Sequence, residues 1–279
     1  DRDSYYGPGN DPLKAYGKTT DLTAMGGAQY VHTFDKCFFM PSDLTAGLEY
    51  NRDRLKDNMW GYNRHTDQTV NIYSAFLQNE WKNDRWGILI GGRLDKHNMV
   101  DNVIFSPRAN LRFNPTQNIN LRLSYSSGFR APQAFDEDMH IENVGGTVAM
   151  IERAKDLKEE KSQSFSASAD MYHRFGAFQT NLLIEGFYTR LTDVFVLGEP
   201  YDRGDGILVK TRSNGPGAKV MGLTLEGKVA YLSILQIQAG LTLQRSRYDE
   251  PHKWHDDAPA EKKIFRTPDT YGYFTATCT

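Results

Sequence analysis

The chain has 279 residues, a formal net charge of −2, 12% aromatic residues and a mean hydropathy of −0.60. A charge this close to neutral and spread along the chain argues against nucleic-acid binding. No run of about 18 apolar residues is present, so we expect no transmembrane helix, although barrel strands would not produce such a run. The two cysteines fit no metal-ligand spacing. The chain ends within a strand-like segment, and we therefore expect a fragment of a longer protein.

Alternation of apolar and polar residues is the dominant pattern along the chain. Ile119, Leu121 and Leu123 alternate with polar residues, and the runs 165–171 and 235–243 follow the same rule. A strand separates two such sets onto opposite faces, whereas a helix would mix them. The pattern predicts an all-β, antiparallel chain of about eleven strands, in chain order 19–34, 41–54, 67–82, 86–97, 104–113, 118–128, 158–174, 177–195, 217–230, 234–248 and 265–279.

The connections between these strands alternate in length. Every second one is short, namely 35–40, 83–85, 114–117, 175–176 and 231–233. The connections between them are mostly longer, namely 55–66, 98–103, 129–157, 196–216 and 249–264. Tight turns at one end and long loops at the other are typical of an outer-membrane barrel.

Aromatic residues gather around the expected short turns. Examples are Trp81 and Trp86 beside one turn, and Phe175 and Phe178 beside another. Aromatic rings collect at membrane interfaces, where the polar tips of Tyr and Trp stay hydrated. The positions therefore predict a girdle at the short-turn end, the alternative being the ordinary preference of aromatic residues for strands.

The other face of the strands is polar. Arg108, Asn110 and Arg112 alternate with apolar residues, and the next strand repeats the pattern. In a small soluble barrel the apolar row points inward, whereas in a wide membrane barrel it faces lipid and the polar row lines the lumen. The strand count favours the transmembrane barrel.

Several short motifs resemble those of the TonB-dependent receptors of bacterial outer membranes. SPRANLRFNPTQNINLRLSYSSGFRAPQAF (106–135) carries the family's SPR, LR.SY and GFRAP elements in order, and GGRLDKH (91–97) is similar to its G.R.D.H strand. LKEEKS (157–162) is similar to the L.PE.S motif, with Glu159 in place of the proline. NGPGAKVMGLTLEGKV (214–229) is similar to the N…A.V.G…E signature.

The resemblance implies part of a 22-stranded barrel whose lumen holds a plug domain. In this chain we expect a partial transmembrane barrel over 1–279, without the plug or a signal peptide. The family implies location in the bacterial outer membrane and import of a large metal chelate, namely a ferric siderophore, haem or cobalamin. The implied partners are the TonB-ExbB-ExbD energy-coupling complex, acting through the plug, and outer-membrane lipid. A surface lipoprotein is a further candidate partner.

The longest expected loop contains GFRAPQAFDEDMHIENVGG (128–146), which combines an arginine, three acids and a histidine. Asp136, Glu137 and Asp138 could include an acid/base pair, but no nucleophile elbow, HExxH or phosphate loop accompanies them, so we expect no enzymatic activity. The acids also lack the 1-3-5 spacing of a calcium loop. His140 follows the FRAP element where a haem receptor of the family would place its axial ligand, the alternative being a solvated histidine. Arg130 is expected to fix the base of the loop by pairing with a carboxylate.

The ligand is expected to contact the long loops, where aromatic and charged residues occur together. Such residues suit either a large, partly apolar ligand or a protein partner. We predict no resident metal or cofactor. The candidate ligand-binding residues are Trp60, Tyr62, His65, Arg130, Gln133, Asp136, Asp138, His140, Trp254 and His255.

Two other classes of protein remain open from the sequence. A passive porin or autotransporter-type barrel would share the strand pattern without coupling to TonB. A soluble all-β surface adhesin would use the same alternation with its apolar face inward. A plug encoded upstream would separate the receptor from the porin, and folding in water without detergent would indicate the adhesin.

Overall fold

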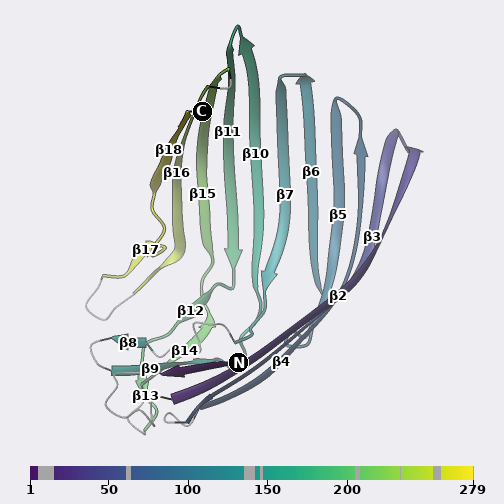
Figure 1. The fold of residues 1–279 in the computed structure, drawn as a ribbon. Helices are drawn as coiled ribbons and strands as arrows, with labels where there is room; N and C mark the ends of the chain where they lie inside the picture. Colours follow the sequence, from purple (N-terminus) through teal and green to yellow (C-terminus); the bar gives the residue numbers. More distant parts are fainter. Residues whose placement is uncertain are drawn as a thin grey trace.

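The computed structural model describes residues 1–5, 16–60, 64–134, 142–144, 147–204, 208–232, 234–253 and 259–278. These residues form eighteen strands in two sheets (Figure 1). Within these ranges, no helix is long and apolar enough to cross a membrane. Both cysteines, Cys37 and Cys278, are free thiols.

The larger sheet has thirteen strands, and its long members pair antiparallel with their neighbours along the chain. Eleven of them coincide with the eleven expected strands, although several extend further than expected. The larger sheet is open among the described residues, with β1 and β2 at one edge and β17 and β18 at the other. Its strands are β1 (Arg2–Tyr5), β2 (Tyr16–Cys37), β3 (Met40–Met59), β4 (Arg64–Lys82), β5 (Trp86–His97), β6 (Ile104–Thr116), β7 (Ile119–Arg130), β10 (Glu160–Phe175), β11 (Phe178–Thr192), β15 (Ala218–Tyr231), β16 (Leu235–His252), β17 (Glu261–Lys263) and β18 (Thr270–Cys278).

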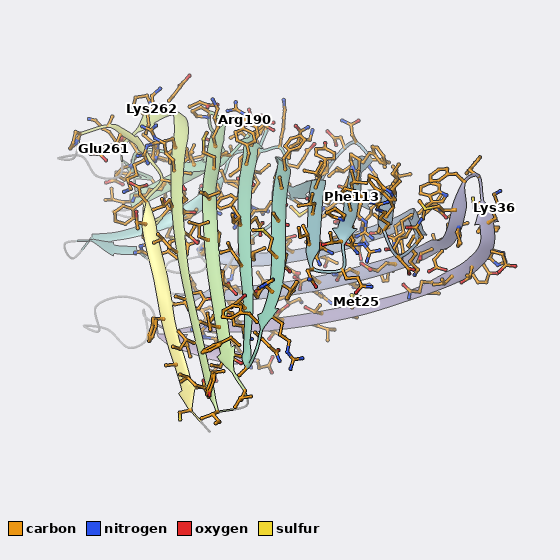
Figure 2. All side chains as sticks on the ribbon, turned by 90° about the horizontal axis from the view of Figure 1, so that it is seen from above. Met25, Lys36, Phe113, Arg190, Glu261 and Lys262 are labelled. Carbon is orange, nitrogen blue, oxygen red and sulfur yellow. The ribbon has the colours of Figure 1, made fainter. Side chains whose placement is uncertain are left out.

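The two faces of the larger sheet differ in chemistry, as the alternation predicts, and side chains leave both faces along the whole curved sheet (Figure 2). The apolar face carries exposed large side chains on every long strand, such as Leu48, Leu77 and Leu241. The polar face carries the buried polar groups, including Ser74 and Asp95. A sheet that exposes its apolar residues and covers its polar ones is inside out relative to a water-soluble barrel.

Aromatic side chains form two rows on the apolar face. Near the short turns, the rings of Phe175 and Phe178 are 5.5 Å apart and those of Trp86 and Phe113 are 4.2 Å apart. Phe165 lies ten positions before Phe175 on β10, away from the short turn, and its ring is 4.8 Å from that of Tyr125. Ten residues at a rise of about 3.3 Å and a tilt of about 40° span about 25 Å, which is the height of a membrane barrel's apolar band.

The two ends of the sheet are different, and Figure 1 shows tight turns at the upper end and longer connections at the lower end. Phe38 and Gly176 adopt positive φ angles in two-residue turns, as such hairpins require, and Leu232 does so directly after the paired Tyr231 in a longer turn. At the lower end lies the second sheet, which has five strands: β8 (Glu142–Val144), β9 (Thr147–Arg153), β12 (Phe195–Leu197), β13 (Tyr201–Asp202) and β14 (Leu208–Asn214).

The second sheet corrects one expectation, because 129–157 and 196–216 were expected to be loops without strands. β9 and β14 pair in parallel, from Leu208 opposite Ala149 to Arg212 opposite Arg153. The connection between β7 and β10 and the connection between β11 and β15 thus form backbone hydrogen bonds with each other. Neither strand has a local hairpin partner of comparable length, so no turn signal marks them in the sequence.

The buried apolar side chains lie mainly at the long-loop end. Met59, Met150 and Val209 are at most 1% exposed and come from β3, β9 and β14. A second small cluster joins Val100, Ile104 and Ala131, with Phe129 packed against it. The larger sheet, called the wall below, would need no such core if lipid covered its apolar face. The long-loop end has to be held together by its own packing.

Candidate functional site

The long-loop end is the candidate ligand-binding end, and hydrogen bonds between distant segments fix its shape. The Asn214 side chain donates to the carbonyl oxygens of Asp193 (2.8 Å) and Lys158 (3.1 Å) and accepts from the Lys158 N–H (2.7 Å). Nη2 of Arg64 donates to the carbonyl of Ile151 on β9, at 3.3 Å. The second sheet is therefore joined both to its own hairpins and to the distant strand β4.

The segment after β7 is held in place by contacts on both sides. The Ala134 N–H donates to Oε1 of Gln68 on β4 at 2.8 Å, and Nη1 of Arg153 on β9 donates to the Pro132 carbonyl at 2.9 Å. Hydrogen bonds that join three elements in this way fix the exit of the chain from the wall. Gln133, a predicted ligand contact, is thereby held at a defined position.

Arg130 lies at the end of β7 on the polar face, opposite Glu160 of β10 in the ladder. Its Cζ atom is 5.6 Å from the centre of the Phe195 ring on β12, a cation–π contact between the wall and the second sheet. The Phe195 N–H in turn donates to Oε2 of Glu160 at 2.9 Å. The contact that the structure shows for Arg130 is with an aromatic ring, and its expected pairing with a carboxylate stays a prediction.

A polar hollow of about 420 Å³ opens beside Gln133 on the polar face of β2, β3 and β4. Carboxylates and amides dominate its polar lining, so it can accept hydrogen bonds from ligand hydroxyl or ammonium groups and donate through its amides and Arg2. Among the described residues, no group of three or more His, Cys, Asp or Glu side chains could hold a metal ion. The hollow is lined by Asp1, Arg2, Thr19, Asp21, Asp53, Leu55, Gln68, Val70, Gln133 and Ala134.

The structure separates the remaining predicted site residues. His65 pairs with Asn58 across β3 and β4, with Nδ1 2.9 Å from Oδ1 of Asn58, and it lies on the apolar face, away from the hollow. Trp60, directly after β3, is 48% exposed. The other six predicted residues lie outside the described ranges and stay predictions: Tyr62, Asp136, Asp138, His140, Trp254 and His255.

Sequence reasoning identified Arg93, Asp95 and His97 only as members of a family motif and assigned them no contacts. Arg93 donates to Oε1 of Glu49 and to Oδ1 of Asp95, both at 2.8 Å, and to Oγ of Ser74 at 2.7 Å. His97, two positions after Asp95 on β5, is fully buried and accepts the Met99 N–H through Nδ1. The motif G.R.D.H thus supplies the polar face with side chains that bond across strands. Their alternation with apolar residues was the signal that could have identified them.

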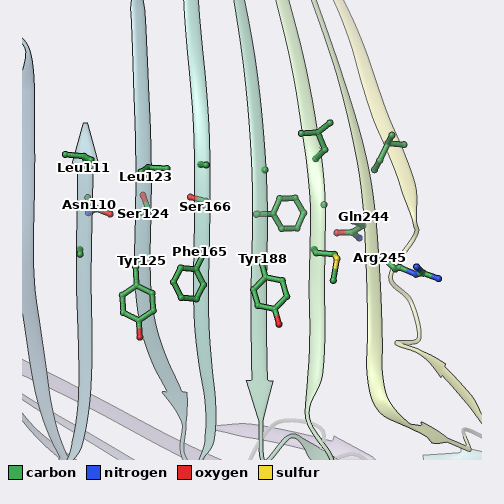
Figure 3. Close-up of a pocket in the computed structure, with 18 of the residues that line it drawn as sticks. Asn110, Leu111, Leu123, Ser124, Tyr125, Phe165, Ser166, Tyr188, Gln244 and Arg245 are labelled. Carbon is green, nitrogen blue, oxygen red and sulfur yellow. The ribbon is translucent and has the colours of Figure 1, made fainter. Parts of the chain in front are cut away.

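A broad, open hollow of about 1130 Å³ follows the middle of the wall from β5 to β18. Figure 3 shows Tyr125, Phe165 and Tyr188 at one level on neighbouring strands, with Arg245 at the same level on β16. Asn110, Ser124, Ser166 and Gln244 form an adjacent level in the same view. The hollow is a surface of the wall, distinct from the polar hollow at the long-loop end.

The comparisons with known proteins agree with this architecture. The family model described as TonB dependent receptor-like, beta-barrel, matches residues 1–277. No curated protein matches the chain. Solved structures with a similar fold include the siderophore receptor PirA from Pseudomonas aeruginosa, with a TM-score of 0.68 at 17% identity over 84% of this chain and 44% of that one.

Two further structures show the same fold. The FrpB iron transporter from Neisseria meningitidis (F3-3 variant) has a TM-score of 0.61 at 14% identity, over 84% of this chain and 36% of that one. A mutant ferric enterobactin receptor, PfeA from Pseudomonas aeruginosa, has a TM-score of 0.62 at 18% identity, over 99% and 49%. The chain spans less than half the length of each of these structures. With an open antiparallel wall, an exposed apolar face and a family match along nearly its whole length, the chain belongs to the TonB-dependent receptor-like β-barrel family.

Proposed function

We propose that the chain forms part of the wall and the extracellular mouth of a TonB-dependent transporter in a bacterial outer membrane. The observation that carries this proposal is the family match over residues 1–277 on a sheet whose exposed face is apolar. The two aromatic rows, about 25 Å apart along the tilted strands, suit the two interfaces of a bilayer. The tight turns then face the periplasm, and the second sheet faces the outside.

The proposed cargo is a ferric siderophore. PirA is a siderophore receptor by name, and the PfeA mutant is a ferric enterobactin receptor in complex with enterobactin. The polar hollow beside Gln133 supports this choice, because its carboxylates and amides suit a hydroxyl-rich chelate. Haem and cobalamin are the competing cargoes, and haem would require a ligand such as His140.

Energy for import would come from TonB-ExbB-ExbD acting through a plug domain that these residues do not form. The polar face of the wall would contact this plug, and the cross-strand network around Arg93 keeps that face rigid. A surface lipoprotein partner would bind the extracellular end. The experimental question is whether the complete receptor binds and imports one class of chelate.

The test uses the full-length receptor purified in detergent and titrated with ferric siderophores, haem and cobalamin by tryptophan fluorescence quenching. We expect tight binding of a ferric siderophore, weakened about tenfold by Gln133→Ala if one hydrogen bond to a charged or polar ligand group is lost. His65→Ala is the matched control, since His65 lies at the same end on the opposite face. Its affinity should stay within twofold of wild type.

Other results would redirect the proposal. Tight binding of haem or cobalamin alone would replace the siderophore as cargo. Binding of none of the three, together with ion conductance of the reconstituted receptor without energy input, would indicate a passive pore. Binding of none without conductance would leave a glycan or peptide as cargo.

A further inference from the structure

Small hydroxyl side chains form a strip along β7 and β10 on the polar face of the wall. Ser124 lies directly opposite Ser166, with Asn110 of β6 on the other side of Ser124 (Figure 3). Directly paired residues in an antiparallel sheet point to the same face. Short side chains leave room beside the backbone that long ones would fill. The serine strip consists of Ser124, Ser126, Gly128, Ser162, Ser164, Ser166 and Ser168.

Arginine side chains occur along the serine strip at intervals of four residues. Arg130 lies at its long-loop end. Arg108 of β6 lies opposite Ser126, and Arg112 of β6 lies directly opposite Arg122 of β7. Counted along β7, these levels are residues 130, 126 and 122, so successive levels are about 13 Å apart. The strip therefore has a cationic group at its start, near its middle and at its end.

The arginines at the middle and the end of the strip have no carboxylate partner among the residues that the structure describes. Arg108 and Arg122 are exposed, and neither makes a hydrogen bond or an ion pair within those ranges. Nη2 of Arg112 donates to the carbonyl oxygen of Asn83 at 3.0 Å, which leaves its charge unneutralised. Like charges directly opposite each other destabilise a sheet. The Arg112–Arg122 pair therefore favours an anion placed between its two guanidinium groups.

Carboxylates lie around the serine strip but not within it. Glu160 and Asp170 of β10 lie beyond its two ends, and Glu185 lies on β11, opposite Ser168. Asp170 already accepts a hydrogen bond from the Tyr172 hydroxyl at 2.7 Å. Between Glu160 and Asp170, the described polar faces of β6, β7 and β10 contain no acid. The strip is therefore cationic, with acids only at its margins.

The Arg112–Arg122 pair lies within the height of the apolar band. Arg122 is three residues from Tyr125 of the aromatic row nearer the long loops, which is about 10 Å along the strand. Ionisable side chains at such a depth face a wet interior, and they commonly mark the path of a substrate or ion. Substitutions on the lumen face of a membrane barrel accordingly alter selectivity.

We propose that the serine strip is the path of an anionic ferric chelate through the barrel, with a second, weaker binding site at Arg112 and Arg122. Guanidinium groups bind negatively charged oxygens through charge-assisted hydrogen bonds, and serine hydroxyls donate to the same oxygens between the arginine levels. Several weak sites in succession let a ligand both enter and leave, whereas one tight site would retain it. The inference rests on the proposed function, and it narrows the cargo to chelates with a net negative charge.

The test measures import of radioactive iron by iron-starved cells that carry the full-length receptor as their only receptor. The probe is ferric enterobactin, an anionic chelate. The double substitution Arg112→Gln and Arg122→Gln should lower the maximal import rate about tenfold, the factor expected when one charge-assisted hydrogen bond is lost. The concentration for half-maximal import should change less than about twofold, because the mouth is intact. Lysine at both positions keeps the charges and should restore most of the rate.

Lys228→Gln is the matched control, because Lys228 is a basic residue on the polar face of β15, two strands from β10. It should leave the import rate within about twofold of wild type. Thermal unfolding gives a second readout for the double variant. Removal of a like-charge pair should leave its Tm unchanged or raise it.

Three results would overturn the proposal. The first is an unchanged import rate in the double variant. The second is slower import together with a lower Tm, which would assign the two arginines to a carboxylate of the plug. The third is a higher half-maximal concentration at an unchanged maximal rate, which would assign them to the binding site at the mouth.

Failure of this inference can be told apart from failure of the proposed function. A receptor that binds no ferric siderophore in the detergent titration would contradict the proposed function. A receptor that binds and imports only ferric siderophores without net negative charge would keep the proposed function and refute the anionic path alone.

Discussion

Replacing Leu241 with lysine tests whether the apolar face contacts lipid. Leu241 on β16 is six positions from Leu235 at the tight-turn edge and four from Arg245 at the other edge. With a rise of about 3.3 Å and a tilt of about 40°, it lies about 15 Å and about 10 Å from the two edges, near mid-bilayer. A lysine facing lipid there should lower the free energy of unfolding by about 2–4 kcal/mol.

Leu235→Lys is the control for this prediction, because the residue type, strand and face are the same. In the structure Leu235 is 38% exposed and Leu241 is 43% exposed, so burial within the protein predicts equal effects. Membrane depth predicts about 0–1 kcal/mol for Leu235→Lys, since a lysine at the interface reaches water. Denaturant titration of the full-length receptor in lipid vesicles measures both. Equal losses at the two positions would refute the contact of this face with lipid.

Three further predictions concern the wall and its extracellular end. Gly222→Ala should lower the free energy of unfolding by about 1–3 kcal/mol, because the new Cβ would lie 2.6 Å from a carbonyl oxygen and 2.6 Å from an aromatic ring. Gly227→Ala, on the same strand, places its Cβ in open space. It should lower the free energy of unfolding by less than half as much, as measured by thermal unfolding. Asn214→Ala removes three hydrogen bonds, which should cost about 1–3 kcal/mol and appear as faster hydrogen exchange in the second sheet; unchanged exchange would contradict this. Arg190 holds the pKa of Asp249 below its usual range, so the stability that the ion pair adds is present above the ordinary pKa of aspartate and is lost as pH falls through the lowered value. The stability difference between wild type and Asp249→Asn should therefore disappear in acid, and a difference that persists would contradict the assignment.

The wall could be predicted from the sequence because its information is local. In β16, residues 235–243 assign alternate side chains to two faces, and the short connection expected at 231–233 predicts the partner strand. Each hairpin repeats this, so eleven strands were located without any knowledge of long-range contacts. Strand ends were predicted less well. β3 was expected to end at residue 54 but ends at Met59, and β4 was expected to begin at residue 67 but begins at Arg64.

The long-loop end could not be predicted in the same way, because its contacts are long-range. β9 pairs with β14, about sixty residues later, and the polar hollow combines residues near the N-terminus with Gln68 and Gln133. A seven-residue strand without a neighbouring hairpin partner looks like a loop in a single sequence. Among the candidate ligand residues, Gln133 lies at a hollow, and its contact with a ligand stays a prediction. The face of His65 depends on a strand extension that the sequence did not reveal.

The position of the apolar core explains why the candidate site lies where it does. Strand ladders and the surrounding lipid would hold the wall, so its residues are free to present one apolar face and one polar face. Above the membrane no lipid is available, and Met59, Met150 and Val209 provide the packing instead. The Arg130–Phe195 contact and the Asn214 hydrogen bonds connect that core to the wall. The hollow beside Gln133 is therefore lined by segments that are joined to both parts.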